Sequence, residues 1–95
     1  MSKLSLVIVT PQKNFPAVSC DSVHLSVCGG EKSKNGGSYG IRKGHAKAVF
    51  SLCDGVIEAK LEGKTVFSAN CGSGFAIVEN NRVTATVDEC TPGEI

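Results

Sequence analysis

The sequence predicts an all-β domain, an antiparallel sandwich or barrel of about nine short strands. Eleven Val, five Ile and five Thr stand against five Leu and one Met, and β-branched side chains pack well on a pleated sheet but lose rotamer freedom in a helix. Apolar residues alternate with polar ones in several short runs, and they never recur with a period of 3.6 residues over three turns. A chain of 95 residues suits one such domain.

Four strands are predicted from the alternation of apolar and polar residues. Successive side chains of a strand point to opposite faces of the sheet, so each apolar trio is expected on one buried face. The trios, in chain order, are Leu4, Leu6 and Ile8; Val23, Leu25 and Val27; Ile57, Ala59 and Leu61; and Val83, Ala85 and Val87. Shorter strands are expected at residues 15–18, 40–42, 48–52, 65–68 and 74–79.

Tight turns are predicted between several of these strands. Asp54-Gly55 is a common turn pair, and Gly63 allows a short turn before the strand that begins at residue 65. Asn80 and Asn81 are the non-glycine residues best suited to a positive φ, as a two-residue hairpin turn requires. Such closely spaced strands with short turns are typical of antiparallel sandwiches and barrels.

One longer loop and a tail complete the organisation of the chain. Residues 29–38 hold four glycines and no large apolar residue, which predicts a mobile loop within the domain. The domain is expected to span residues 1–90, and residues 91–95 are expected to form a frayed tail.

Positive charge gathers in the first half of the chain. Residues 1–50 carry seven Lys or Arg and two Asp or Glu, whereas residues 51–95 carry three and seven. A basic segment at 32–47 could bind single-stranded nucleic acid on a small β-barrel if exposed aromatic side chains stacked on the bases. Only Tyr39 lies nearby and the chain has no Trp. A solvated patch, or one that meets an acidic or polar protein, is therefore preferred, and nucleic-acid binding stays as the alternative.

Neither catalysis nor a metal or cofactor site is predicted. Cysteines stand at positions 20, 28, 53, 71 and 90 and form no C-x-x-C pair, so reduced thiols acting as small apolar side chains are expected. His24 is expected on the outward, solvated face of its strand, and no nucleophile elbow or phosphate loop is present. No run approaches the roughly 20 apolar residues of a membrane span. The first ten residues indicate a strand rather than a signal peptide, so a cytosolic protein is expected.

Several motifs, in order, resemble the epsilon subunit of F-type ATP synthases. Residues 39–46 (YGIRKGHA) are similar to a hallmark turn of that family, roughly G-[IV]-x-P-G-H-A, and residues 54–57 to the P-G-x-[IV] start of its next strand. Residues 71–84 resemble the pattern S-G-G-F-x-x-V-x-x-N-x-V-T, and residues 6–11 match its opening strand, which ends in T-P or S-P. The resemblance covers residues 3–90.

The resemblance implies an N-terminal epsilon domain, a two-sheet sandwich of about ten mostly antiparallel strands. Such a domain has no catalytic residues and no cofactor. It docks on the gamma subunit, rests on the c-ring and completes the central stalk, so that proton-driven rotation is coupled to ATP synthesis. The implied location is peripheral, on the cytoplasmic face of the bacterial inner (plasma) membrane. The candidate c-ring contacts are Ser38, Tyr39, Arg42, Lys43 and His45, and the candidate gamma contacts are Val7, Val9 and Phe75.

The chain departs from the family pattern in three places. Family members usually continue into two C-terminal helices that inhibit ATP hydrolysis and in some bacteria bind ATP, so this chain, which ends at Ile95, is expected to lack both activities. Lys43 stands where the hallmark turn usually has Pro, which predicts a less rigid turn. The loop at 29–38 is longer than usual and carries Lys32 and Lys34 where acidic residues are common.

Overall fold

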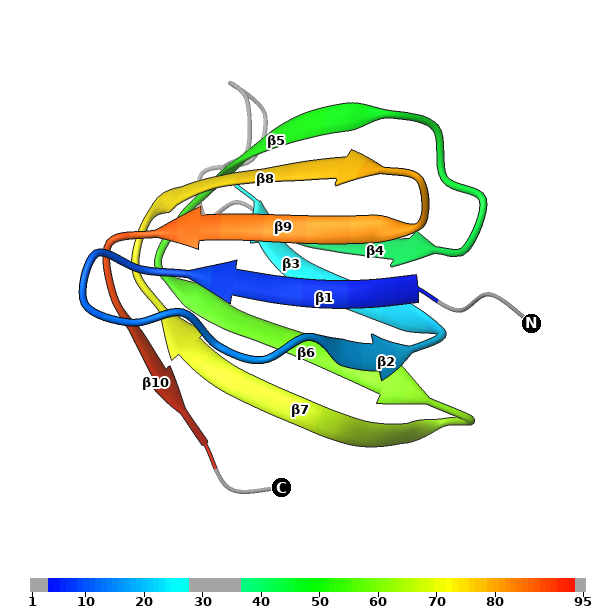
Figure 1. The fold of residues 1–95 in the computed structure, drawn as a ribbon, viewed down its shortest axis with the longest axis horizontal. Coiled ribbons are helices and arrows are strands. Elements are labelled where there is room, and N and C mark those ends of the chain that lie inside the picture. Colours follow the sequence, from blue (N-terminus) through cyan, green and yellow to red (C-terminus); the bar gives the residue numbers. More distant parts are fainter. Residues whose placement is uncertain (1–3, 28–36, 94–95) are drawn as a thin grey trace.

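The computed structural model of the protein describes residues 4–27 and 37–93, and it confirms the all-β sandwich. Ten strands lie in two layers that face each other across a common core (Figure 1). Among the described residues there is no helix long and apolar enough to cross a membrane. The strands are β1 Leu4–Val9, β2 Val18–Cys20, β3 Ser22–Val27, β4 Gly37–Arg42, β5 Ala48–Leu52, β6 Gly55–Leu61, β7 Lys64–Cys71, β8 Gly74–Glu79, β9 Arg82–Val87 and β10 Cys90–Pro92.

The two layers are parts of one continuous, curled sheet. The strand order is β10-β7-β6-β3-β5-β8-β9-β1-β2, with β4 paired to the other edge of β3. The path passes from one layer to the other where Val27 of β3 pairs with Leu52 of β5. Strand β1 runs parallel to β9, and the other described pairs are antiparallel. Strands β5, β8, β9, β1 and β2 therefore form the layer seen in front in Figure 1.

The core lies between the layers and is built from the alternating apolar residues. The predicted trios of β1 and β9 are buried throughout, whereas Val27 and Leu61 at the ends of β3 and β6 are only partly buried. Small residues such as Ala76 and Ala85, which pair directly across β8 and β9, let the layers approach. The buried apolar residues are Leu4, Leu6, Ile8, Cys20, Val23, Leu25, Ile41, Leu52, Ile57, Ala59, Ala69, Cys71, Ala76, Val78, Val83, Ala85 and Val87.

The predicted hairpin turns are confirmed by their backbone angles. Asn80 and Asn81 have φ values of 52° and 60°, as a two-residue turn between β8 and β9 requires. Glu62 and Gly63 have φ values of 53° and 80° between β6 and β7. Both turns lie at the end of the sandwich where β1 begins (Figure 1).

Two sequence predictions differ from the structure at the second strand and at the C-terminus. Residues 15–18 are not a strand: Phe15 makes only a single backbone bond to Ile8, and β2 begins at Val18. The predicted frayed tail is paired as far as β10, where Thr91 and Pro92 lie opposite Asn70 and Ala69 of β7. Proline fits there because β10 is an edge strand, in which the backbone N–H that proline lacks is not needed to bond a neighbouring strand.

Two further predictions concern the loop at 29–38 and the cysteines. Most of the loop, including Lys32 and Lys34, lies outside the described residues. Cys20, Cys71 and Cys90 are free thiols as expected. Cys53, however, is disulfide-bonded, so the expectation of reduced thiols is wrong at this position.

Candidate docking surface

The outward surface of β5, β8, β9 and β1 carries two rows of uncharged side chains. The strand register aligns the rows, each of which crosses all four strands. These side chains point away from the core because they alternate with buried residues along each strand. The first row is Val49, Ile77, Thr84 and Val7, and the second is Ser51, Phe75, Thr86 and Val9.

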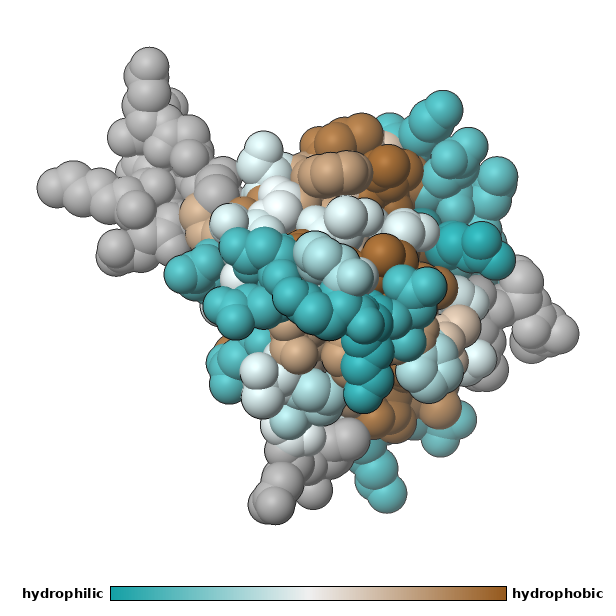
Figure 2. Space-filling view, turned by 60° about the vertical axis from the view of Figure 1, so that its left-hand side comes forward, coloured by the Kyte–Doolittle hydropathy of each residue, from teal (hydrophilic) through white to brown (hydrophobic). Residues whose placement is uncertain are grey.

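We call the five apolar members of these rows, Val7, Val9, Val49, Phe75 and Ile77, the outer apolar face. Val49 is 66% exposed and Phe75 is 43% exposed, and the other three are partly buried. Figure 2 shows hydrophobic surface at the top of the molecule, at the height of β5 and β8 in Figure 1, above a band of hydrophilic surface. Contiguous apolar surface bordered by polar residues is typical of protein–protein contact sites.

The structure thus brings together residues that are far apart in the sequence. Val7, Val9 and Phe75, which the sequence analysis names as candidate contacts, lie on this one face. Sequence reasoning missed Val49 and Ile77. Ile77 could have been found, because it stands two residues from Phe75 on the same strand and shares its face. Val49 needed the β5–β8 register, which places it opposite Ile77.

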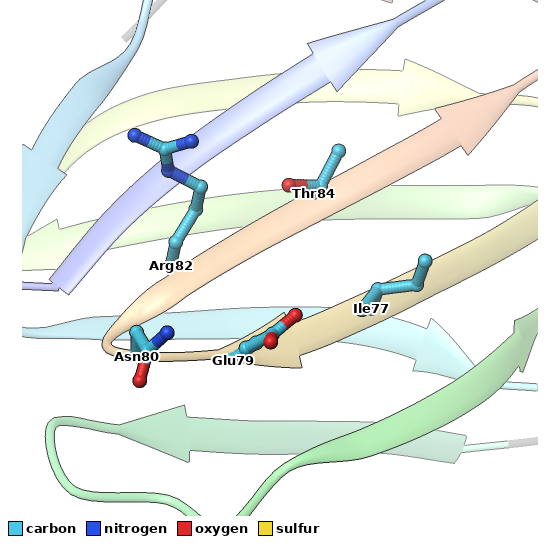
Figure 3. A pocket seen from close by; sticks show the side chains of 5 residues that line it. All are labelled: Ile77, Glu79, Asn80, Arg82 and Thr84. Atoms are coloured by element: carbon cyan, nitrogen blue, oxygen red, sulfur yellow. The ribbon is translucent and has the colours of Figure 1, made fainter.

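Charged side chains border the outer apolar face at the end where β8 turns into β9. The ammonium nitrogen of Lys47 lies 3.8 Å from a carboxylate oxygen of Glu79, and both side chains are exposed. Arg82 stands opposite Glu79 across the hairpin. Figure 3 shows these strands from close by: Glu79 and Ile77 come from β8, Arg82 and Thr84 from β9, and with Asn80 they line a shallow depression. An apolar centre with a charged rim is the usual composition of a protein interface.

A cluster of three rings joins β4, the turn after it and β5. The rings of Tyr39 and Phe50 pack with their centroids 4.7 Å apart, and the ring of His45 stands edge-on to both. His45 Nδ1 lies 2.7 Å from the carbonyl oxygen of Ala46, so this nitrogen donates a proton. In the neutral ring Nε2 then accepts from the Tyr39 hydroxyl at 3.1 Å. His45 therefore holds the turn after β4 in place.

Asn81 ties that turn to the β8–β9 hairpin. Its side-chain oxygen accepts a bond from the backbone N–H of Gly44 at 2.7 Å. Its backbone carbonyl accepts from the N–H of Ser5, at the start of β1, at 2.9 Å. One residue thus links three chain segments, including two that carry the family-like motifs.

The five residues predicted to contact a ring are spread along β4 and the turn after it. Ser38 pairs with Ser26 near one end of the sandwich, whereas Arg42 pairs with Ser22 near the other. Four residues of strand span about 13 Å. Arg42 and Lys43 are exposed and line a shared depression with His24, whereas the side chains of Tyr39 and His45 are engaged with each other. A partner resting on one end of the sandwich therefore contacts Ser38 or Lys43, but not both.

Within the described part of the chain, no group of three or more His, Cys, Asp and Glu side chains could hold a metal ion. His24 points outward as expected, but it is half-buried, with its ring against Gly40. The alternative of single-stranded nucleic-acid binding is not favoured, because the ring of Tyr39 packs on Phe50 and does not stand free for base stacking. The surface suits protein docking.

Comparison with known proteins gives a family. Residues 3–93 match the family described as "ATP synthase, Delta/Epsilon chain, beta-sandwich domain". An ATP synthase epsilon chain from Synechococcus sp. is 33% identical over 91 residues, which cover 96% of this chain and 61% of the relative. A chloroplastic ATP synthase epsilon chain from Daucus carota is 28% identical over 90 residues, covering 95% and 62%. The chain thus spans about three fifths of the length of these curated relatives.

Solved structures share the fold. A chain of the Euglena gracilis mitochondrial ATP synthase, in an assembly of OSCP, F1 and c-ring, superposes with a TM-score of 0.77 at 20% identity, covering 97% of this chain and 54% of that chain. A chain of the Tetrahymena thermophila mitochondrial ATP synthase, from its central stalk and c-ring, gives a TM-score of 0.68 at 14% identity, covering 94% and 66%.

Proposed function

Because this chain belongs to the ATP synthase delta/epsilon family, through its beta-sandwich domain, we propose that it is a non-catalytic part of the central stalk of a proton-translocating ATP synthase. In this role it docks on the gamma subunit and rests on the c-ring, so that the ring and gamma rotate together. The observation that carries the proposal is the family match over residues 3–93. The solved relatives come from assemblies that include the c-ring.

The outer apolar face is the proposed docking site for gamma. Its two rows contain no charged residue and cross four strands of one layer. Burying apolar side chains yields roughly 25 cal/mol per Å², and this gain is not screened by salt. A stalk contact must hold while torque passes through it, so a salt-resistant contact suits this face. The backbone beneath is stiff because β8, β9 and β1 pair on both sides, and β5 pairs with β8 along its whole length.

The turn of Arg42 and Lys43 is the proposed contact with the c-ring. Both side chains are exposed at the end of the sandwich, where Arg42 is the last residue of β4 and Lys43 follows it. Charges at the edge of an interface contribute mainly to orientation and register, and they do so through complementary charge on the partner. Ser38 and Tyr39, on the same strand, remain candidates for contact nearer its other end. Through such a complex the chain would be peripheral to a membrane, at the cytoplasmic face in a bacterium.

The gamma contact is tested by measuring binding of variants to the gamma subunit over a salt series. Val49→Ser and Phe75→Ala remove exposed apolar groups from the outer apolar face. Each is expected to weaken binding about tenfold, because truncation of a well-buried interface side chain costs about 1–2 kcal/mol or more. Binding of the unmodified chain should change little at moderate salt.

Val56→Ser provides the matched control. Val56 is 43% exposed, like Phe75, but lies on β6 in the other layer. Its substitution is expected to leave gamma binding unchanged. Equal weakening by Val56→Ser and Val49→Ser would argue against the outer apolar face as the site. Failure of the unmodified chain to bind gamma, with salt-sensitive retention of oligonucleotides, would overturn the proposed function itself.

A further inference from the structure

Two free thiols lie opposite each other where the C-terminal strand meets the sheet. Cys90 of β10 pairs with Cys71 of β7 in an antiparallel register. The Cys71 thiol donates to the sulfur of Cys90 across 3.2 Å. The two residues are 19 positions apart in the sequence, and only the pairing of β10 with β7 brings them together.

The backbone geometry of this pair suits a disulfide. The N–H of Gly72 donates to the carbonyl of Glu89, and the N–H of Gly93 donates to the carbonyl of Ser68. Bonded and non-bonded positions alternate in an antiparallel ladder, so Cys71 and Cys90 form a non-hydrogen-bonded pair, in which the Cα atoms lie about 4.5 Å apart. Disulfides span Cα separations of about 4.4–6.8 Å. The sulfurs need only approach from 3.2 Å to bonding distance.

The two thiols differ in access. Cys71 is 6% exposed, whereas Cys90 is partly exposed at the edge strand. Burial raises the pKa of the Cys71 thiol, and its hydrogen bond to Cys90 raises that pKa further. A surface depression is lined by Cys71 together with the carboxylates of Asp54 and Glu89. Cys90 is therefore the first to react, because it is the more exposed thiol. The nearby carboxylates disfavour anionic reagents, so a neutral reagent is preferred.

We propose that Cys71 and Cys90 are a redox-modification site. A small-molecule disulfide oxidises the two thiols to a cross-strand disulfide, which joins β10 covalently to β7. The Cys90 thiol loses its proton and attacks one sulfur of the reagent, whose own S–S bond breaks and whose first thiolate leaves and is protonated. The Cys71 thiol then loses its proton, attacks the sulfur of Cys90 and releases the second thiolate, which is protonated in turn. Two cysteine thiols are oxidised and the reagent disulfide is reduced to two thiols.

The loop that this disulfide closes includes two of the four strands that carry the outer apolar face, β8 and β9. The bond closes a loop from Cys71 to Cys90 that contains the whole β8–β9 hairpin. Strand β10 has three residues and lies at the end of the sheet, next to β7. Closing such a loop restricts the unfolded chain, so the oxidised form should have a Tm higher by on the order of 10 °C.

The test exposes the chain to 2-hydroxyethyl disulfide, a neutral reagent, and maps the products by mass spectrometry after trypsin digestion. Cys71 and Cys90 fall on separate tryptic peptides, residues 65–82 and 83–95. The expected result is a linked pair of these peptides, two hydrogens lighter than their sum, and a higher Tm. Addition of 2-mercaptoethanol in excess should remove the linkage, and because it also reduces the disulfide of Cys53, its effect on Tm is compared with that on the Cys71→Ser chain treated in the same way.

Substitutions supply the controls. Cys71→Ser and Cys90→Ser should abolish the linked peptides and the gain in Tm. Cys20→Ser, at a buried thiol on β2 that donates to the carbonyl of Leu4, should leave both intact. Absence of the linked peptides from the unmodified chain, or a reagent adduct that stays on Cys90 without ring closure, overturns the proposal. A linkage that forms without a gain in Tm overturns the proposed stabilisation by the bond.

Discussion

At the scale of single residues, the family-like motifs act mainly by holding turns in place. His45 donates to Ala46 and accepts from Tyr39, so it fixes the turn after β4 and does not reach out to a partner. Asn81 supplies a positive φ and one side-chain bond, which joins the β8–β9 turn to Gly44. The fixed turns in turn hold the neighbouring side chains at the surface, above all those of Arg42 and Lys43.

Asn81 can be tested by comparing substitutions at the two central positions of its turn. Asn81→Ala loses both the preference for positive φ and the bond to Gly44, so we expect the free energy of unfolding to fall by about 2 kcal/mol. Asn80→Ala, the control, has a similar φ of 52° and should lose about 1 kcal/mol. Urea unfolding measures both. Equal losses would show that the bond to Gly44 contributes nothing.

At the scale of elements, β8 and β9 are the central pair of the docking layer. They pair over their whole length, from Gly74 opposite Val87 to Glu79 opposite Arg82. Gly74 begins β8 where a Cβ would run into the backbone carbonyl of Thr86 and the Cα of Val87. Backbone atoms cannot rotate away as a side chain can, so glycine is required for the two strands to approach here.

Gly74→Ala is therefore expected to push β8 away from β9. The cost should be about 1–3 kcal/mol of unfolding free energy, the range for inserting a methyl group into a well-packed site. Gamma binding should weaken as well, because Phe75 follows directly. Gly93→Ala is the matched control, since its Cβ would come no closer than 3.7 Å to the carbonyl of Ser68. Thermal unfolding of the two variants distinguishes them, and equal stability would refute the close approach at Gly74.

At the scale of the whole molecule, the proposed contacts lie on two different parts of the surface. The outer apolar face covers the side of one layer, and the turn with Arg42 and Lys43 lies at an end of the sandwich. A rigid body with one contact on its side and one on its end can connect two partners. The continuous sheet supplies that rigidity, because its ten strands are joined in one path of hydrogen bonds with β4 attached to β3.

Charge reversal tests the end contact. Replacing Arg42 and Lys43 by Glu should reduce proton-driven ATP synthesis in the reconstituted complex several-fold. The new carboxylates would repel the complementary negative charge proposed on the c-ring, and the effect should be strongest at low salt because salt screens this repulsion. The fold should be unaffected, since both side chains are exposed. Lys13→Glu is the control for Lys43→Glu, because each reverses one exposed charge and Lys13 follows the end of β1, at the opposite end of the sandwich. Unchanged synthesis in the Arg42 and Lys43 variant would shift the ring contact to the Ser38 end.

The sequence by itself determined the class of the fold, most strand positions and the family. Strands β5 and β8 begin and end at the predicted residues, and Asn80-Asn81 and Gly63 mark real turns, because the strand preference of a short run and backbone φ are local properties of the chain. Composition and short motifs are local too, and the resemblance to epsilon chains rests on them.

Only the tertiary structure decided which distant residues meet. It placed Val49 beside Ile77, joined Asn81 to Gly44, and brought Cys71 within 3.2 Å of Cys90. It also paired Thr91 and Pro92 with β7, where the sequence alone indicates a frayed tail. Each of these outcomes depends on strand register and on the order of strands in the sheet. Strand register and strand order are both set by packing across the whole core, so they cannot be predicted from a local pattern in the sequence.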